Sequence, residues 1–294
     1  MTVSRGRRPA ADEVQGSNRN RIRTRALALL ASGVLGVALL AVPALPASAG
    51  KAHYVGFAAT STGMGYWITD SKGDTIAYND ATCPCSPPAN FGPVVGIAAT
   101  ESGYGYWLVD KAGDVANYGD AMNWGSLTGI TITHPIVSIA DGPSDDGYWL
   151  TDSSGDVYAF GTAGYDGGAF SVKHHGSIVA LVPTIDKLGY WQVNKKGDVF
   201  PFGDAASIPI SPPPPPPGLT TPIVAMAASP DGGGFWLADK AGDVYPFGTA
   251  LSYPLTSAGL TPGVPVVAMG GTVRGYWLLQ QNGNVAGYGA AVVY

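Results

Sequence analysis

The sequence predicts an all-β chain folded as a single six-bladed β-propeller. A tripeptide of Gly, an aromatic residue and Trp recurs six times, at intervals of 40 to 45 residues, with its Trp at positions 67, 107, 149, 191, 236 and 277. The 294 residues include 42 Gly and 24 Pro, and only 13% are charged, which favours short strands joined by tight turns. A strand-rich repeat with a period in the low forties is typical of propeller blades.

Each repeat is predicted to form four short strands, in units starting near residues 54, 94, 136, 178, 223 and 266. The first is apolar, as in "VVGIAAT" from Val94, which suits a strand buried on both faces near a crowded axis. The second has the pattern Gly-Tyr-Trp-Leu-x-Asp, and the third resembles "DVYAFG". A weaker fourth strand is expected from segments such as "AMNWGSL" and "GYDGGAF".

A five-residue turn joins the second and third strands, for example Asp152-Ser-Ser-Gly155-Asp156. The opening Asp or Asn can accept hydrogen bonds from backbone amides further along the turn, and the Gly supplies a positive φ. The sixth copy, 280–284, departs from this pattern. A calcium loop is the alternative, but one turn offers too few oxygen ligands, so we expect neither a metal nor a cofactor.

The adjacent Tyr and Trp of the second strand should point to opposite sides of the sheet and pack against the two neighbouring blades. The chain begins its first unit with "HYVGFAAT" and ends with "GAAVVY", which reads as a fourth strand. The ring then closes in one of two ways: the last unit docks beside the first, or residues 292–294 complete the first blade.

Residues 1–49 are predicted to be a secretory signal peptide, leaving a propeller of residues 50–294. Four arginines between positions 19 and 25 precede an apolar run from Ala26 to Val42, and Ala47-Ser48-Ala49 matches a cleavage site. An uncleaved membrane anchor is the alternative. We expect cleavage, no membrane span afterwards, and a secreted or cell-envelope location.

Removing the leader leaves nine basic and 19 acidic side chains, a net charge of −10. Nucleic-acid binding needs clustered Lys and Arg, and Arg274 is the only arginine after the leader, so this class of function is excluded. We expect a monomer.

The pattern "IVxIAxxxxxGYWLxDxxGDVxxFGxA" resembles repeats of secreted actinobacterial proteins that are usually interpreted as propeller blades. It is similar, more loosely, to tryptophan-glycine and kelch-type repeats. The resemblance spans residues 54–294 and implies architecture rather than an activity, because propellers serve as enzymes, lectins and scaffolds alike.

The sequence favours a secreted binding or scaffold module for a glycan, peptide or protein partner. Candidate binding residues are those in the variable segments: Trp124, Tyr165, His174, His175 and Tyr253. A propeller-fold glycosidase or lyase is the alternative, but no catalytic residue can be named, because the repeated acids are assigned to turns and no nucleophile or metalloprotease motif occurs.

Two features interrupt the repeats. Cys83-Pro84-Cys85 could form a small, strained disulfide, remain free or pair between molecules, or bind a metal; an exported protein favours the disulfide. Pro212 to Pro217 is predicted to be an extended surface loop, with a docking segment as the alternative.

Overall fold

The computed structural model describes residues 52–294 apart from 83–86, 88–90, 211–213 and 254–258. The predicted signal peptide, Cys83 and Cys85 therefore lie outside the described residues. Within the described part, the chain is all-β, and its regular helical structure is limited to short 3-10 turns at Pro143–Asp145, Ala169–Ser171 and Asp204–Ser207. No described helix has the length and apolar character needed to cross a membrane.

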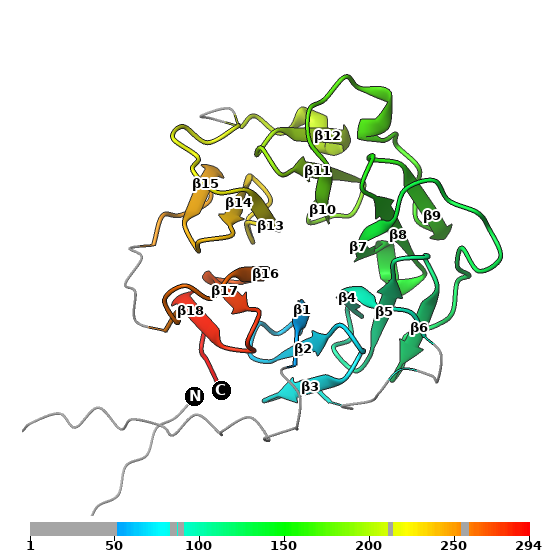
Figure 1. The fold of residues 1–294 in the computed structure, drawn as a ribbon, viewed down its shortest axis with the longest axis horizontal. Helices are drawn as coiled ribbons and strands as arrows, with labels where there is room; N and C mark the ends of the chain where they lie inside the picture. The colour runs from blue at the N-terminus through cyan, green and yellow to red at the C-terminus, as the bar shows by residue number, and fades with distance from the viewer. Residues whose placement is uncertain (1–51, 83–86, 88–90, 211–213, 254–258) are drawn as a thin grey trace, which may run out of the picture. The chain divides into compact units, whose positions relative to one another are not determined.

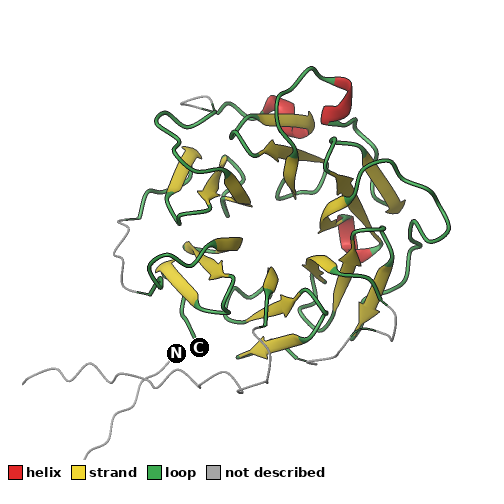
Figure 2. Cartoon of the chain, viewed as in Figure 1, coloured by secondary structure: helices red, strands yellow, loops and turns green. Residues whose placement is uncertain are grey.

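Six antiparallel sheets of three strands are arranged around a central axis (Figures 1 and 2), as predicted for a six-bladed propeller. The strands of blades one to three are β1 (Tyr54–Ala59), β2 (Tyr66–Asp70), β3 (Thr75–Tyr78), β4 (Val94–Ala99), β5 (Tyr106–Asp110), β6 (Val115–Tyr118), β7 (Ile136–Asp141), β8 (Gly147–Asp152) and β9 (Val157–Gly161). Those of blades four to six are β10 (Ile178–Pro183), β11 (Gly189–Asn194), β12 (Val199–Gly203), β13 (Ile223–Ala228), β14 (Gly234–Asp239), β15 (Val244–Gly248), β16 (Val266–Thr272), β17 (Gly275–Gln280) and β18 (Val285–Gly289).

The predicted fourth strand is wrong: each sheet in the described residues has three strands. Segments such as 121–127 and 290–294 form no ladder with the third strand of their blade. Instead, in every blade except the fourth, the Trp of the second strand holds this segment through its indole N–H. Trp107 Nε1 donates to the Met122 carbonyl at 2.7 Å, and Trp277 Nε1 to the Val292 carbonyl at 2.8 Å. A side-chain bond thus replaces the missing ladder.

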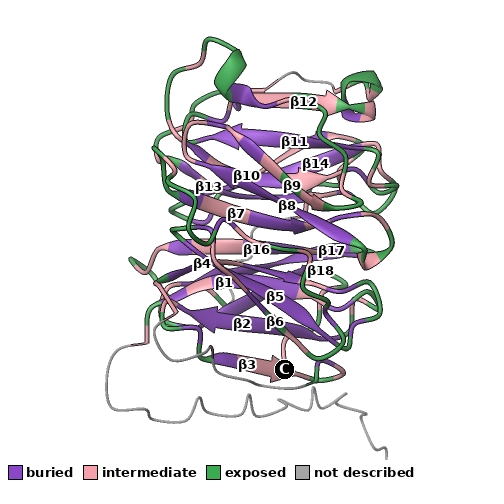
Figure 3. Cartoon of the chain, turned by 90° about the vertical axis from the view of Figure 1, so that its right-hand side faces the viewer, coloured by how far each residue is buried: buried purple, intermediate pink, exposed green. Residues whose placement is uncertain are grey.

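The wedge between neighbouring blades is filled by aromatic pairs, as predicted from the Tyr-Trp repeat. Each Trp packs against the Tyr or Phe of the next blade, with ring centroids 5.4 to 5.8 Å apart; the pairs are Trp67–Tyr106, Trp107–Tyr148, Trp149–Tyr190, Trp191–Phe235, Trp236–Tyr276 and Trp277–Tyr66. All twelve side chains are almost fully buried, and Figure 3 shows the buried residues concentrated in the strands. Large rings bury much apolar area per residue, so these pairs contribute strongly to the cohesion between blades.

Backbone hydrogen bonds repeat the same closure around the ring. The first amide of each first strand donates to the carbonyl of the second turn residue in the preceding blade, as Val94 does to Ser71 at 3.0 Å. Tyr54 makes the equivalent bond to Gln281 at 3.1 Å. Blade six therefore docks beside blade one, the first of the two predicted modes, while Val293 and Tyr294 cover that junction.

The two ends of the ring differ. One end, here called the turn face, holds the Asp-x-x-Gly-Asp turns and the starts of the first strands. The other, the loop face, holds the links between the first and second strands. On the turn face, Asp152 Oδ1 accepts the amides of Ser154, Gly155 and Asp156 at 2.8 to 3.1 Å, and Gly155 has φ +96°. The prediction that the repeated acid is a turn residue is confirmed.

The polyproline segment lies against its own blade over the part that the structure describes. Pro216 is buried, and a Cβ built on Gly197 would meet its ring at 2.7 Å. Pro216 thus covers the glycine of the blade-four turn, as Leu127 covers Gly113 in blade two.

Candidate functional site

Trp124 and Tyr253 occupy the same position in their blades, seventeen residues after the repeated Trp. Trp124 is half-buried in the core between blades two and three, and its Nε1 donates to the Asp145 carbonyl at 3.0 Å. Tyr253 packs edge-on against Tyr276, with centroids 5.9 Å apart. Both rings therefore help to seal a blade junction, which leaves only part of their surface for a ligand.

The other predicted binding residues lie along the segment that links blade three to blade four. Tyr165 is exposed. Both ring nitrogens of His174 contact backbone carbonyls, those of Gly176 at 3.0 Å and Ser154 at 3.1 Å, and its ring lies 5.4 Å from Phe200. His175 is exposed and offers its carbonyl to Asn194. The five predicted residues are thus distributed over three blade junctions and do not form one site.

A cavity of about 520 Å³ lies on the loop face between blades five and six, and Tyr253 is part of its wall. The wall also includes Trp236, Leu251, Asp231, Thr249 and Arg274. Tyr253 is held in place by its hydroxyl, which donates to the Arg274 carbonyl at 2.9 Å. The cavity therefore combines aromatic and apolar walls with one cationic and one anionic side chain.

Asp231 is a fixed, ionised group at this cavity. Its Oδ1 accepts the hydroxyls of Ser229 at 2.6 Å and Thr249 at 2.7 Å, and the amide of Gly233 at 3.2 Å. These bonds, the one from Ser229 first, hold the pKa of the Asp231 carboxyl below its usual range. Arg274 is exposed and forms no ion pair with a described carboxylate, so its guanidinium is available to an anionic ligand group.

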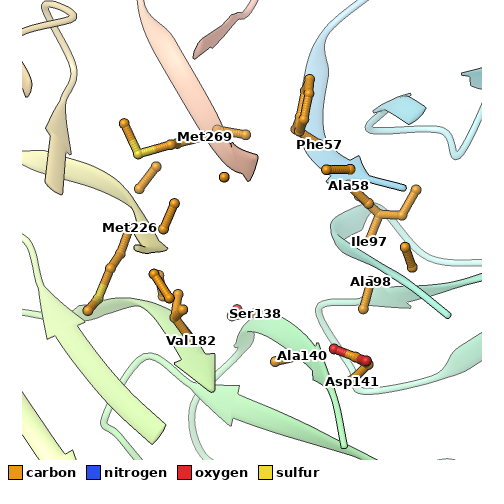
Figure 4. A pocket seen from close by; sticks show the side chains of 18 of the residues that line it. Phe57, Ala58, Ile97, Ala98, Ser138, Ala140, Asp141, Val182, Met226 and Met269 are labelled. Carbon is orange, nitrogen blue, oxygen red and sulfur yellow. The ribbon is translucent and has the colours of Figure 1, made fainter. Parts of the chain in front are cut away.

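The central channel forms a second cavity, of about 550 Å³, lined by the first strands of all six blades. Its walls are mainly apolar; Phe57, Ile97, Met226 and Met269 contribute to them (Figure 4), although these side chains are largely buried in the junctions between blades. The carboxylate of Asp141 also lies in this wall (Figure 4).

A group of charged side chains lines the loop-face end of the channel. Lys187 Nζ lies 2.5 Å from Asp141 Oδ2 and 3.6 Å from Glu101 Oε2, so it joins blades two, three and four. Burial raises the pKa of the Asp141 carboxyl, against the opposing effect of Lys187. Burial works to lower the pKa of the Lys187 ammonium, but Asp141 and Glu101 hold it above its ordinary value.

Neither Asp231 nor Lys187 was predicted from the sequence to bind a ligand. Arg274 was considered there only in the argument against nucleic-acid binding. Arg274 could have been found, because it is the only arginine after residue 49. Asp231 lies in a Gly-rich loop that resembles a plain turn, so its two hydroxyl donors become evident only once the strands are in place. Among the described residues, no group of three His, Cys, Asp or Glu side chains could hold a metal ion.

Comparison with known proteins identifies the fold alone. No family model and no curated protein sequence matches the chain. A structural genomics protein of unknown function from Bacteroides thetaiotaomicron is similar with a TM-score of 0.58 and 13% identity, over 83% of this chain and 70% of that chain. The β-propeller domain of Cps50 (Swd1) from Myceliophteria thermophila is similar with a TM-score of 0.52 and 8% identity, over 82% and 98%. The chain has a β-propeller fold. Identities this low assign no function.

Proposed function

We propose that this propeller is a secreted or cell-envelope module that binds an acidic glycan, and that the glycan enters the cavity between blades five and six. The predicted leader is the basis for the location, and the propeller supplies the rigid frame that holds the loops. The single observation behind the site is the combination of Tyr253, Asp231 and Arg274 around one cavity of about 520 Å³.

Each of the three side chains suits part of a sugar ligand. The Tyr253 ring offers an apolar face on which a sugar ring can pack. Arg274 suits the carboxylate of an acidic sugar, because a guanidinium binds carboxylates through two parallel hydrogen bonds. Ser229, Thr249 and Asp231 place hydroxyl and carboxylate oxygens at the same wall, where they can exchange hydrogen bonds with sugar hydroxyls.

An array of neutral and uronic-acid glycans, followed by titration calorimetry of each hit, tests this proposal on the purified protein. We expect uronic-acid glycans to bind, and R274Q to weaken that binding at least tenfold without changing the melting temperature. K173Q is the matched control, because Lys173 is also exposed and lies outside this cavity. Binding that is equal in R274Q and the wild type would reject the site, and binding of acidic peptides alone would reject the glycan.

A propeller-fold glycosidase or lyase is the second candidate, and one observation favours it. At the loop-face mouth of the channel, Asp141 has a raised pKa while Glu101 is exposed beside the same lysine. Two carboxylates in different environments are what acid–base hydrolysis of a glycoside requires. Against it, the Asp141 carboxylate is held by Lys187, which leaves it little freedom to donate a proton. Release of reducing ends from a bound glycan, abolished in D141N, would establish this alternative.

A further inference from the structure

The turn face holds a third cavity, of about 870 Å³, that opens into the same channel. One residue of each turn, the second, lies at its rim: Ser71, Lys111, Ser153, Lys195, Lys240 and Gln281. Three of these six are lysines. His53 and Ser177 add further hydrogen-bonding groups, and Pro93, Pro135, Pro222 and Pro265 complete the rim.

The backbone fixes these rim residues in place. The carbonyl of each second turn residue accepts the first amide of the next blade; Lys195, for example, accepts from Ile223 at 3.0 Å. The amide of Lys195 donates to Ser177 at 3.0 Å, and that of Lys240 to Pro222 at 2.9 Å. The lysine side chains therefore start from anchored positions around the mouth, although their ammonium groups are exposed.

The charge at this mouth is the opposite of that of the whole chain. No Asp or Glu is among the described residues that line it, whereas the chain after the leader has 19 acidic and nine basic side chains. Lys111, Lys195 and Lys240 form no ion pair with a described carboxylate. The opening acids of the blade-two and blade-five turns, Asp110 and Asp239, accept amides of their own turns. Three unneutralised lysines at one mouth favour an anionic group there.

Below the lysines the wall becomes apolar. Six half-buried valines, one from each first strand, line both this cavity and the channel: Val55, Val95, Val137, Val179, Val224 and Val267. The channel beyond them is lined by further half-buried apolar side chains, such as Ala180, Val182 and Ala268. Burying an alkyl chain against such a wall is favourable, because apolar surface is removed from water.

We propose that the turn-face mouth binds a single-chain anionic amphiphile. Its carboxylate or phosphate lies among Lys111, Lys195 and Lys240, and its alkyl chain passes the six valines into the channel. The opposite mouth holds Glu101 and Asp141 against one lysine, Lys187, so charge favours entry of the anionic head at the turn face only. The turn-face cavity, with its three lysines, shares no lining residue with the cavity between blades five and six, so each proposal can fail without the other.

Titration calorimetry with octanoate, octyl phosphate, 1-octanol, acetate and inorganic phosphate tests this proposal. We expect both octyl anions to bind, and affinity in the series from butyrate to decanoate to rise about fourfold per methylene, the value for full burial of each CH₂. K111Q/K195Q/K240Q should lower the affinity for the octyl anions at least tenfold and remove their advantage over 1-octanol. The control K72Q/K173Q/K196Q removes the same charge from exposed lysines outside the cavity and should bind as the wild type does.

The remaining outcomes separate the two headgroups or reject the site. Tighter binding of octanoate assigns a carboxylate, and tighter binding of octyl phosphate assigns a phosphate. The proposal is overturned if the two triple variants bind the octyl anions equally well, or if the wild type binds 1-octanol as tightly as octanoate. It is also overturned if acetate or inorganic phosphate binds as tightly as the octyl anions. So would the absence of binding by any octyl compound. Melting temperatures of the two triple variants, which we expect to match, show that both are folded.

Discussion

The indole ring of Trp277 lies 5.6 Å from the phenol ring of Tyr66, so the last blade packs against the first as every other neighbouring pair does. This contact joins residues that are more than two hundred positions apart in the chain. Forming it requires all six blades to be in place, because the ring closes only after the sixth. Loop closure over this distance is entropically costly, and the contacts at the junction offset that cost.

Removing residues 290–294 should lower the melting temperature markedly. The deletion takes away the Val292 carbonyl that pairs with Trp277 Nε1, and the Tyr294 ring that packs 6.4 Å from Tyr66. We expect a loss of about 2 to 4 kcal/mol, from one buried unpaired donor and one lost ring. Thermal unfolding measures it. The variant Y294A should lose only part of that amount, and an unchanged melt after the full deletion would show that this segment does not stabilise the closure.

Blade four offers a natural comparison for the indole hydrogen bond. Trp191 Nε1 is buried and has no partner in the described part of the chain, because the residue fifteen positions on lies in the 3-10 turn Asp204–Ser207. In blade two, by contrast, Trp107 Nε1 donates to the Met122 carbonyl. W107F should therefore cost about 1 to 2 kcal/mol more than W191F, since only the first loses a hydrogen bond. Urea unfolding of both variants measures the difference, and equal losses would assign the effect to ring volume alone.

The fold was predictable because the same few physical requirements recur six times. The pairing of Trp149 with Tyr190 follows from strand alternation and the blade period, and the turn at Asp152 follows from its Asx and Gly. The fourth strand was predicted wrongly because its segments lack a strict alternation. What replaces it, a bond from an indole such as that of Trp107 to a carbonyl fifteen residues on, has no sequence signal of its own.

The candidate sites were harder to predict because a repeat hides what is specific to one blade. Trp124 and Tyr253 stood out as rare aromatics, yet their shared spacing from the repeated Trp indicates packing at a blade junction. The lysines of the turn-face mouth stayed unnoticed, because which residue of a turn faces the axis depends on the closed ring. Lys111 and Lys72 look alike in the sequence, and of the two only Lys111 lines the turn-face cavity.

Replacing Asp152 tests the turn itself. Its Oδ1 accepts three backbone amides and the Ser154 hydroxyl, and the side chain is fully buried. D152A should cost about 2 to 3 kcal/mol, because buried amides lose their acceptor. D152N should cost much less, since Asn194 makes the same bonds to Lys196 and Asp198 in blade four. Chemical unfolding compares the two, and a loss in D152N as large as in D152A would show that the charge, rather than the oxygen acceptor, holds the turn.

The buried tyrosines should make the protein sensitive to alkali. Burial raises the pKa of Tyr66, Tyr148 and Tyr190 to about 12, whereas an unfolded phenol loses its proton near 10. Above pH 10 the unfolded chain therefore binds fewer protons than the folded one, and stability falls as the pH rises towards 12. Urea midpoints between pH 8 and pH 11.5 should be level at first and then decline. In Y148F/Y190F the decline should be shallower, and Phe235, which packs against Trp191 at the equivalent position, shows that the junction accommodates a phenyl ring. A decline of equal steepness in the double variant would mean that other groups cause the alkaline loss.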